Sequence, residues 1–213
     1  MPPEKPKTER LFPPGYWDRP FSQAVGDKEA ESIHAAVGAA LSAREMAEEA
    51  LASLCLLLAE TTNQKALLAI KQIFGSIESS AGRRNALHRL YEVYFHPHQD
   101  EKVFKTPFKQ LMEAFSDGSK RRDDIAHGVV VLVRRGSDDQ FFLVPSGYNS
   151  GRNFPFKPAA ADEFPFNVMK GKYRYSSKEI GAFRTQFEAL QHQTIEYAMS
   201  VQKVDGQLPE PPR

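Results

Sequence analysis

Cysteine is almost missing from this chain, which has only Cys55 among its 213 residues. A lone cysteine cannot form an internal disulfide, and the leucines on either side of Cys55 suit a small buried hydrophobe. An apolar secretion signal is missing from the first residues, and the longest apolar run, 54–59, is far too short to cross a membrane. These absences predict a soluble protein of the reducing cytoplasm, with no membrane partner.

The chain also lacks a strong net charge, because its 28 basic residues nearly balance its 27 acidic ones and leave a net charge of +1. No overall field would therefore attract a polyanion, so any binding of nucleic acid must come from a local patch. The chain also lacks a glycine-rich phosphate loop and clustered zinc-ligand spacing, and a proline separates His96 from His98. We expect no metal and no cofactor.

Proline is plentiful, but it is concentrated at the two ends of the chain. Six prolines among the first 20 residues exclude a helix or a central strand there, which predicts a Pro-rich N-terminal arm over residues 1–22. Gly206 and three further prolines predict a flexible C-terminal tail over residues 205–213. The region between them, 23–204, is expected to form a single helical domain.

Apolar residues recur at steps of three, four and seven over much of this region, which is the period of helices with one buried face. A long helix is expected over 27–60, with Asp27 as its N-cap. Glycine after aspartate at Asp117-Gly118 is expected to end a later helix, and Ser119 to cap the next one. The remaining helices are expected over 66–77, from about 81 to 95, over 104–115, and from 119 to about 128.

The pattern then changes to two runs of β-branched and aromatic residues, 129–133 and 140–144, which predict a hairpin. Residues 145–172 mix glycine, proline, basic and aromatic residues in an irregular segment. The rings and cations of this segment, together with Tyr173, Arg174 and Tyr175 just after it, either bind single-stranded RNA or hold the segment onto the helices. A capping box at Ser176 and Glu179 then begins a last helix of about 25 residues. The expected fold is mainly α: a helical bundle with a small β-hairpin and irregular insertion, about 129–172, before the C-terminal helix.

The clearest functional signal is the segment Lys120-Arg121-Arg122-Asp123-Asp124-Ile125-Ala126-His127-Gly128. Arginine offers a planar fork of donors to a phosphate, and histidine moves a proton near neutral pH. Asp123 lies four residues before His127 on the same helix face, where a carboxylate can hold one ring nitrogen. A purely structural interpretation stays open, in which His127 is a cation at a helix C-terminus and the two arginines pair with the two aspartates.

Spacing alone does not distinguish these interpretations, because Arg83 and His88 show the same separation and are interpreted as a solvated basic helix face. The run from Arg122 to Gly128, however, resembles the signature of HEPN-type helical domains: arginine, a polar residue, three more residues, then histidine, often with glycine after it. The hairpin and the insertion depart from the family's layout. The resemblance implies metal-independent cleavage of RNA at a symmetric dimer interface, often in toxin–antitoxin or antiphage systems. Some members have lost catalysis and serve as RNA-binding or assembly modules.

The resemblance implies that His127 transfers protons, Arg122 binds the phosphate, and Asp123 is the polar or orienting residue. Arg121 and Lys120 are expected to assist in binding the substrate. Cleavage by the 2′-hydroxyl needs a base, an acid and positive charge near the phosphorane.

One chain offers a single plausible catalytic imidazole, and residues five apart on a helix point about 140° away from each other. A two-fold axis would supply both imidazoles and more guanidiniums. We therefore expect a homodimer that cleaves RNA, with an antitoxin protein as a further partner. The alternative is a non-catalytic helical dimerisation or RNA-binding module.

Overall fold

The computed structural model of the protein describes residues 10–20, 25–95, 101–135, 138–146 and 173–205. The first nine residues of the expected arm lie outside the described residues. So do most of the expected insertion, 147–172, and the expected tail beyond residue 205.

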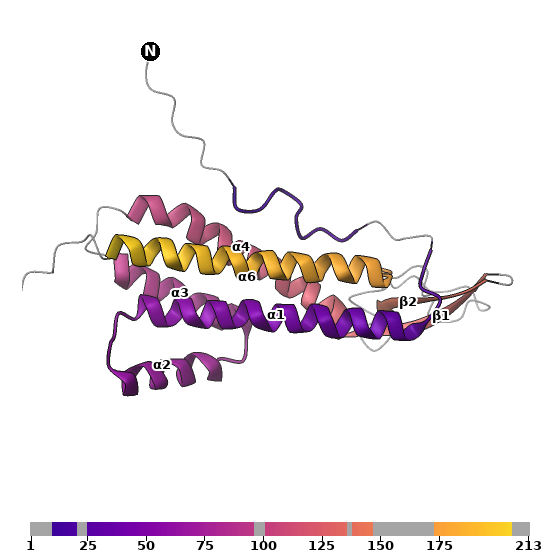
Figure 1. The fold of residues 1–213 in the computed structure, drawn as a ribbon, viewed down its shortest axis with the longest axis horizontal. Helices are drawn as coiled ribbons and strands as arrows, with labels where there is room; N and C mark the ends of the chain where they lie inside the picture. Colours follow the sequence, from indigo (N-terminus) through magenta and orange to yellow (C-terminus); the bar gives the residue numbers. More distant parts are fainter. Residues whose placement is uncertain (1–9, 21–24, 96–100, 136–137, 147–172, 206–213) are drawn as a thin grey trace, which may run out of the picture. The chain divides into compact units, whose positions relative to one another are not determined.

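The described chain is mainly helical, with one hairpin before the last helix (Figure 1). This confirms the fold class expected from the sequence. None of the described helices combines the length and the apolar character that a membrane crossing requires. The elements in chain order are α1 (Ala30–Leu58), α2 (Gln64–Ser76), α3 (Ser80–Phe95), α4 (Glu101–Ala126), β1 (Gly128–Arg135), β2 (Asp138–Pro145) and α6 (Ser177–Asp205).

By its internal contacts the chain divides into two compact units, and each unit takes a part of α1, α4 and α6. Unit 1 consists of residues 1–16, 48–116 and 190–213, and unit 2 of residues 17–47 and 117–189. The single helical domain expected over 23–204 remains a prediction.

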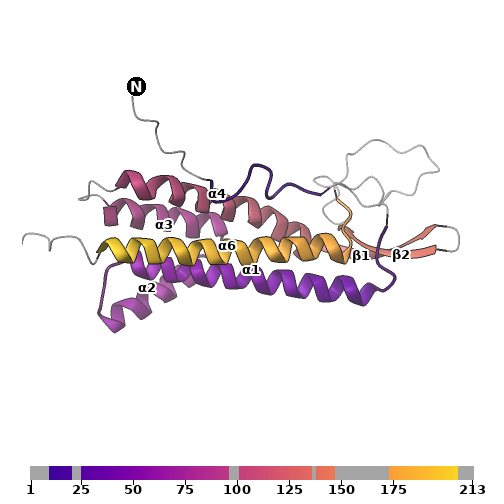
Figure 2. The same cartoon turned by 45° about the horizontal axis from the view of Figure 1, so that its top comes forward.

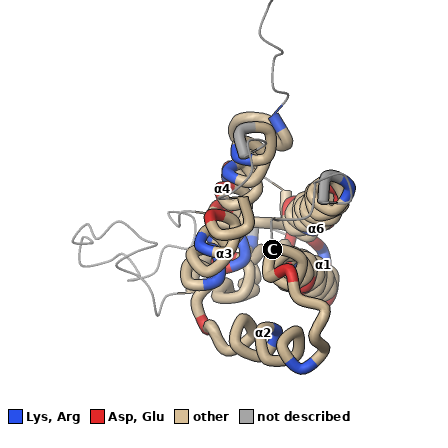
Figure 3. The backbone as a smooth tube through the Cα atoms, turned by 90° about the vertical axis from the view of Figure 1, so that its left-hand side faces the viewer, with Lys and Arg blue, Asp and Glu red and all other residues tan. Residues whose placement is uncertain are grey.

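Aromatic rings form the centre of unit 1, where α3, α4 and α6 meet; Figure 3 looks along these helices. Tyr91 stacks on Phe108 with 4.3 Å between the ring centroids, and Phe95 stacks on Phe104 at 5.3 Å. The ring of Tyr197 lies 6.1 Å from that of Phe108. Burying an aromatic side chain stabilises a fold by roughly 1.5–3 kcal/mol, so these rings hold the helices of unit 1 together.

Unit 2 contains the hairpin, whose strands pair antiparallel from Gly128 opposite Pro145 to Arg135 opposite Asp138 (Figure 2). The strands are thus longer than the expected runs 129–133 and 140–144. Alternation places Gln140, Phe142 and Val144 on one face of β2, and all three are buried. Phe142 and Val144 make part of this face apolar, and Leu143 on the opposite face is buried too, which explains why the largely apolar run 140–144 predicts a strand.

The other edge of β2 is also occupied, by residues that directly precede helices. Asp27, just before α1, exchanges two backbone hydrogen bonds with Phe141, at 3.0 and 2.7 Å. Tyr175, just before α6, exchanges two with Leu143, at 2.8 and 2.9 Å. The starts of both helices are therefore hydrogen-bonded to the hairpin. These bonds hold together the end of unit 2, where α4 leads into β1.

Two helix boundaries expected from the sequence are wrong. The chain does not break at Asp117-Gly118, because α4 continues through this point from Glu101 to Ala126. Asp27 does not cap the first helix, which begins only at Ala30. Instead the Asp27 carboxylate accepts the backbone N–H of Ser177, at 2.7 Å, and its hydroxyl. Asp27 thus caps α6, whose first residue is Ser177.

Candidate functional site

The end of α4 leads directly into the hairpin. The helix ends at Ala126, and the backbone N–H of His127 still donates to the carbonyl of Asp123 at 3.1 Å. Gly128 then begins β1, so the sequence correctly placed the end of this helix. A Cβ on Gly128 would lie 2.7 Å from the side chain of Leu143 and 3.1 Å from the carbonyl oxygen of Asp124. Glycine is therefore required for the helix end to approach β2 closely.

One face of this helix end points to solvent and carries the expected catalytic residues. His127 is exposed, and the side chains of Arg122 and Asp123 are 43% and 63% exposed. Arg122 Nη1 lies 3.2 Å from Asp123 Oδ1, so this carboxylate pairs with the arginine. Among the described residues, none forms a hydrogen bond or ion pair with the His127 ring. The orienting contact expected between Asp123 and His127 is absent from the single chain.

The two residues expected to assist in substrate binding differ in their surroundings. The Lys120 side chain is 65% exposed, and its Nζ lies 2.7 Å from Asp117 Oδ1. Lys120 therefore lies at the surface. Arg121 instead is buried, and its Nη1 lies 3.2 Å from Oδ2 of Asp124. The roles expected for both residues remain predictions, but in this structure Arg121 points into unit 2.

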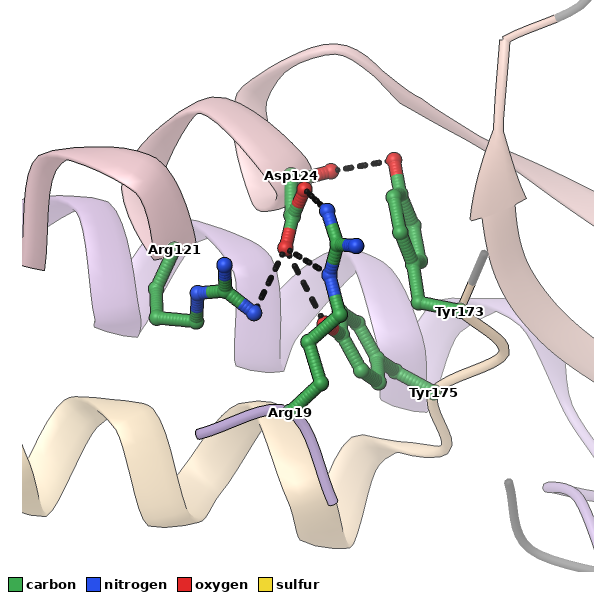
Figure 4. A network of polar contacts seen from close by, with 5 residues as sticks. All are labelled: Arg19, Arg121, Asp124, Tyr173 and Tyr175. Atoms are coloured by element: carbon green, nitrogen blue, oxygen red, sulfur yellow. Dashed lines mark hydrogen bonds and ion pairs between the residues drawn. The ribbon is translucent and has the colours of Figure 1, made fainter. Parts of the chain in front are cut away.

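The other face of the helix end carries Asp124, on which four side chains converge (Figure 4). We call Arg19, Arg121, Asp124, Tyr173 and Tyr175 the Asp124 cluster. Arg19 grips the carboxylate with two bonds, from Nε to Oδ2 at 2.9 Å and from Nη2 to Oδ1 at 2.6 Å. These hydrogen bonds raise the pKa of the Arg19 guanidinium above its ordinary value. Such a bidentate, charge-assisted pair fixes direction as well as distance.

Two tyrosines complete the Asp124 cluster from the segment before α6. The hydroxyl of Tyr173 donates to the Asp124 carbonyl at 2.8 Å, and that of Tyr175 donates to Oδ2 at 3.1 Å. Their rings stack with 4.7 Å between centroids. Burial raises the pKa of both phenols, and the nearby charge of Asp124 adds to this shift. Both hydroxyls therefore stay protonated at neutral pH and remain hydrogen-bond donors.

The structure thus separates residues that are adjacent in the sequence. Arg122, Asp123 and His127 lie at the surface, while Arg121 and Asp124 lie inside, which confirms the two arginine–aspartate pairings of the structural interpretation. Sequence reasoning missed Arg19. It placed Tyr173 and Tyr175 only among rings that either bind RNA or hold the irregular segment onto the helices, and both tyrosines are buried. The alternation of tyrosines just before a capping box was the one available signal, since alternate residues of an extended segment share a face.

Within the described residues, no three His, Cys, Asp or Glu side chains gather as metal ligands would. Comparison of the chain with protein-family models, with curated proteins and with solved structures finds no match. The HEPN resemblance therefore rests on the motif from Arg122 to Gly128 and on the mainly helical layout of the chain.

Proposed function

We propose that the protein is a metal-independent endoribonuclease of the HEPN type, with His127 and Arg122 in its active site. The observation that carries the proposal is the solvent-facing arrangement at the end of α4. Within six residues, an arginine, an aspartate and a histidine are all accessible to a large substrate. Arg122 would hold the scissile phosphate, His127 would transfer the proton, and Asp123 would be the polar residue that orients one of them.

The proposed active unit is a homodimer. A single chain presents one imidazole at this site, and its ring has no carboxylate partner among the described residues. General-base removal of the 2′-hydroxyl proton and general-acid protonation of the leaving oxygen need two proton-transfer groups. A two-fold axis close to His127 would bring a second imidazole and a second Arg122 to the same phosphate.

Cleavage of RNA in excess chelator tests the proposal. General acid–base catalysis contributes about 10²–10⁴-fold to a rate, so His127→Ala should lower the cleavage rate at least a hundredfold. Arg122→Ala should lower it by a similar factor because it removes charge from the phosphorane. Retention of full activity by highly purified His127→Ala protein would remove the assignment.

Matched control variants exist on other helices. His192 on α6 is 68% exposed and paired with Glu196, and Arg89 on α3 is 82% exposed and paired with Glu92. His192→Ala and Arg89→Ala remove the same residue types from other solvent-exposed helical positions. Both should cleave RNA at the wild-type rate, whereas a loss equal to that of His127→Ala would point to non-specific RNA binding by surface cations.

A second candidate is a non-catalytic dimerisation or RNA-binding module. The Arg122–Asp123 ion pair favours the dimerisation form of this candidate, because a carboxylate that neutralises the arginine competes with a phosphate. This candidate predicts no RNA turnover by the wild-type protein, and loss of the dimer or of RNA binding in Arg122→Ala. RNA turnover by the wild-type protein distinguishes the two, and sedimentation of the same variants shows whether Arg122→Ala loses the dimer.

Expression in cells tests the proposed setting, a toxin–antitoxin or antiphage system. The ribonuclease should arrest growth, and both His127→Ala and Arg122→Ala should relieve the arrest. An antitoxin partner, if encoded nearby, should protect the cells by covering His127. Normal growth on strong expression of soluble, active protein would contradict this setting without affecting the enzymatic proposal.

A further inference from the structure

We infer that Arg19 of the N-terminal arm positions the end of α4 by gripping Asp124, and that it thereby sets the orientation of His127. For its catalytic consequence the inference rests on the proposed function. Arg19 does not touch the proposed reacting groups, so it is a positioning residue. The role belongs to a part of the chain about a hundred residues away in sequence, since Arg19 and Asp124 are 105 residues apart.

Asp124 is close to His127 at the end of α4. Asp124 lies three residues before His127, less than one helical turn. It is held by both its carboxylate and its carbonyl oxygen, so neither its side chain nor its backbone can rotate freely. The next backbone contact, from His127 N–H to the Asp123 carbonyl, joins the histidine to this fixed turn. A displacement of Asp124 would therefore be carried to His127.

Arg19 holds Asp124 more firmly than Arg121 does. Arg19 makes two hydrogen bonds of 2.9 and 2.6 Å to the carboxylate. Arg121 makes one contact of 3.2 Å, and its buried Nε and Nη1 form no hydrogen bond of good geometry. A buried carboxylate costs free energy unless it is paired and hydrogen-bonded, so the fork of Arg19 is the main compensation.

The part of the arm that carries Arg19 is itself anchored in unit 2. Trp17, two residues before Arg19, is 7% exposed, and its ring lies 5.2 Å from that of Phe187. A Cβ on Gly118 would come within 3.2 Å of the Trp17 ring, which shows how closely the arm approaches α4. The guanidinium of Arg19 also lies 5.4 Å above the ring of Tyr173. The packing of Trp17 and the contact with the Tyr173 ring therefore hold Arg19 beside Asp124.

The test compares Arg19→Gln with Arg19→Lys in the full-length protein, with histidine rings labelled for NMR. Glutamine removes the charge and the fork, whereas lysine keeps the charge and can restore one bond. Arg19→Gln should shift the ring resonance of His127 and lower kcat for RNA cleavage. A misplacement of about 1 Å can cost about a hundredfold in rate, so we expect a tenfold to hundredfold loss, with KM changed less than kcat. Arg19→Lys should recover part of both effects.

Arg83→Gln is the matched control for a loss that is merely structural. Arg83 is a half-buried arginine of unit 1, its side chain 25% exposed, paired with Glu48 at 3.4 Å. It also donates to the carbonyl of Ile77 at 2.9 Å. Arg83→Gln should lower the melting temperature without moving the His127 resonance or the pH profile of cleavage. Equal changes in Arg83→Gln and Arg19→Gln would overturn the inference.

The resonance and the cleavage rate separate the two proposals. A His127 resonance that does not move in folded Arg19→Gln protein overturns the positioning role, even if the wild-type protein cleaves RNA. A resonance that moves in a protein without ribonuclease activity supports the positioning role and removes the proposed function. If Arg19→Gln does not fold, Tyr173→Phe gives the second measurement, because it removes only the bond to the Asp124 carbonyl. It should move the same resonance by a smaller amount, and no shift there would count against positioning.

Discussion

At the scale of single residues, Asp124 and its neighbour Asp123 have the same chemistry and opposite surroundings. The Asp124 side chain is 8% exposed and faces two guanidiniums, whereas that of Asp123 is 63% exposed. Removing one partner of a buried ion pair costs about 3–5 kcal/mol, while an exposed pair contributes at most about 1 kcal/mol. We expect Asp124→Asn to lower the free energy of unfolding in urea by about 3 kcal/mol and Asp123→Asn by less than about 0.5 kcal/mol. Equal effects would show that Arg19 and Arg121 find other compensation.

The sequence could predict part of this difference. Ile125 is apolar, and Arg121 and Asp124 lie four and one positions before it, so the helical period turns all three toward the interior. The same period leaves Arg122, Asp123 and His127 outside. The other partners of Asp124 (Arg19, Tyr173 and Tyr175) could not be predicted, because they lie 105, 49 and 51 residues away in the chain. No local pattern specifies which distant cation reaches a buried carboxylate.

At the scale of elements, α4 shows that a glycine can either follow the end of a helix, as Gly128 does, or allow close packing within it, as Gly118 does. Gly118 was expected to end a helix, but it has no positive φ and is buried beneath two rings. A Cβ there would lie 3.2 Å from Trp17 and 3.3 Å from Phe187. The sequence cannot show this role, since Trp17 is about a hundred residues away. For Asp27 the sequence correctly indicated a helix cap but not which helix is capped. The helix that Asp27 caps begins 150 residues later.

This interpretation of Gly118 can be tested against Gly38, which lies in α1 with nothing within 4 Å of its Cβ position. Alanine is a better helix former than glycine by about 0.5–1 kcal/mol, so Gly38→Ala should stabilise the protein by that amount. Gly118→Ala gains the same helix propensity but presses on two rigid rings. Overpacking costs roughly 1–3 kcal/mol, so we expect its free energy of unfolding to fall at least 1 kcal/mol below that of Gly38→Ala. Urea unfolding measures both, and equal stabilisation would mean that the rings move aside.

At the scale of the whole molecule, the helical periods and the hairpin pattern were sufficient to predict the fold class. They did not predict how α1, α4 and α6 are shared between two compact units. Amphipathic stripes show that a helix has a buried face, but not which neighbour covers each part of it. The aromatic centre of unit 1 and the Asp124 cluster of unit 2 are assembled from distant segments. This explains why candidate functional residues could be predicted only where the motif is continuous in sequence.

Both units also bury groups whose ionisation opposes folding. The free energy of unfolding should therefore decrease at alkaline pH. Burial raises the pKa of Cys55 in unit 1 to about 11. Burial likewise raises the pKa of Tyr197 in unit 1 and of Tyr173 and Tyr175 in unit 2. In the unfolded chain these groups ionise near their ordinary pKa values, about 8.5 for the thiol and about 10 for the phenols.

Above about pH 8.5 the unfolded chain therefore binds fewer protons than the folded one, and the free energy of unfolding must fall as the pH rises. Each group lowers it by at most about 1.4 kcal/mol per pH unit between its unfolded and folded pKa values. Urea unfolding followed by circular dichroism at pH 7, 9, 10 and 11 should show this decline. Cys55→Ala should show a shallower slope between pH 9 and 11, since only the phenols then contribute. A free energy of unfolding that is constant or rises up to pH 11 would mean that these hydroxyls and the thiol are not buried as the structure places them.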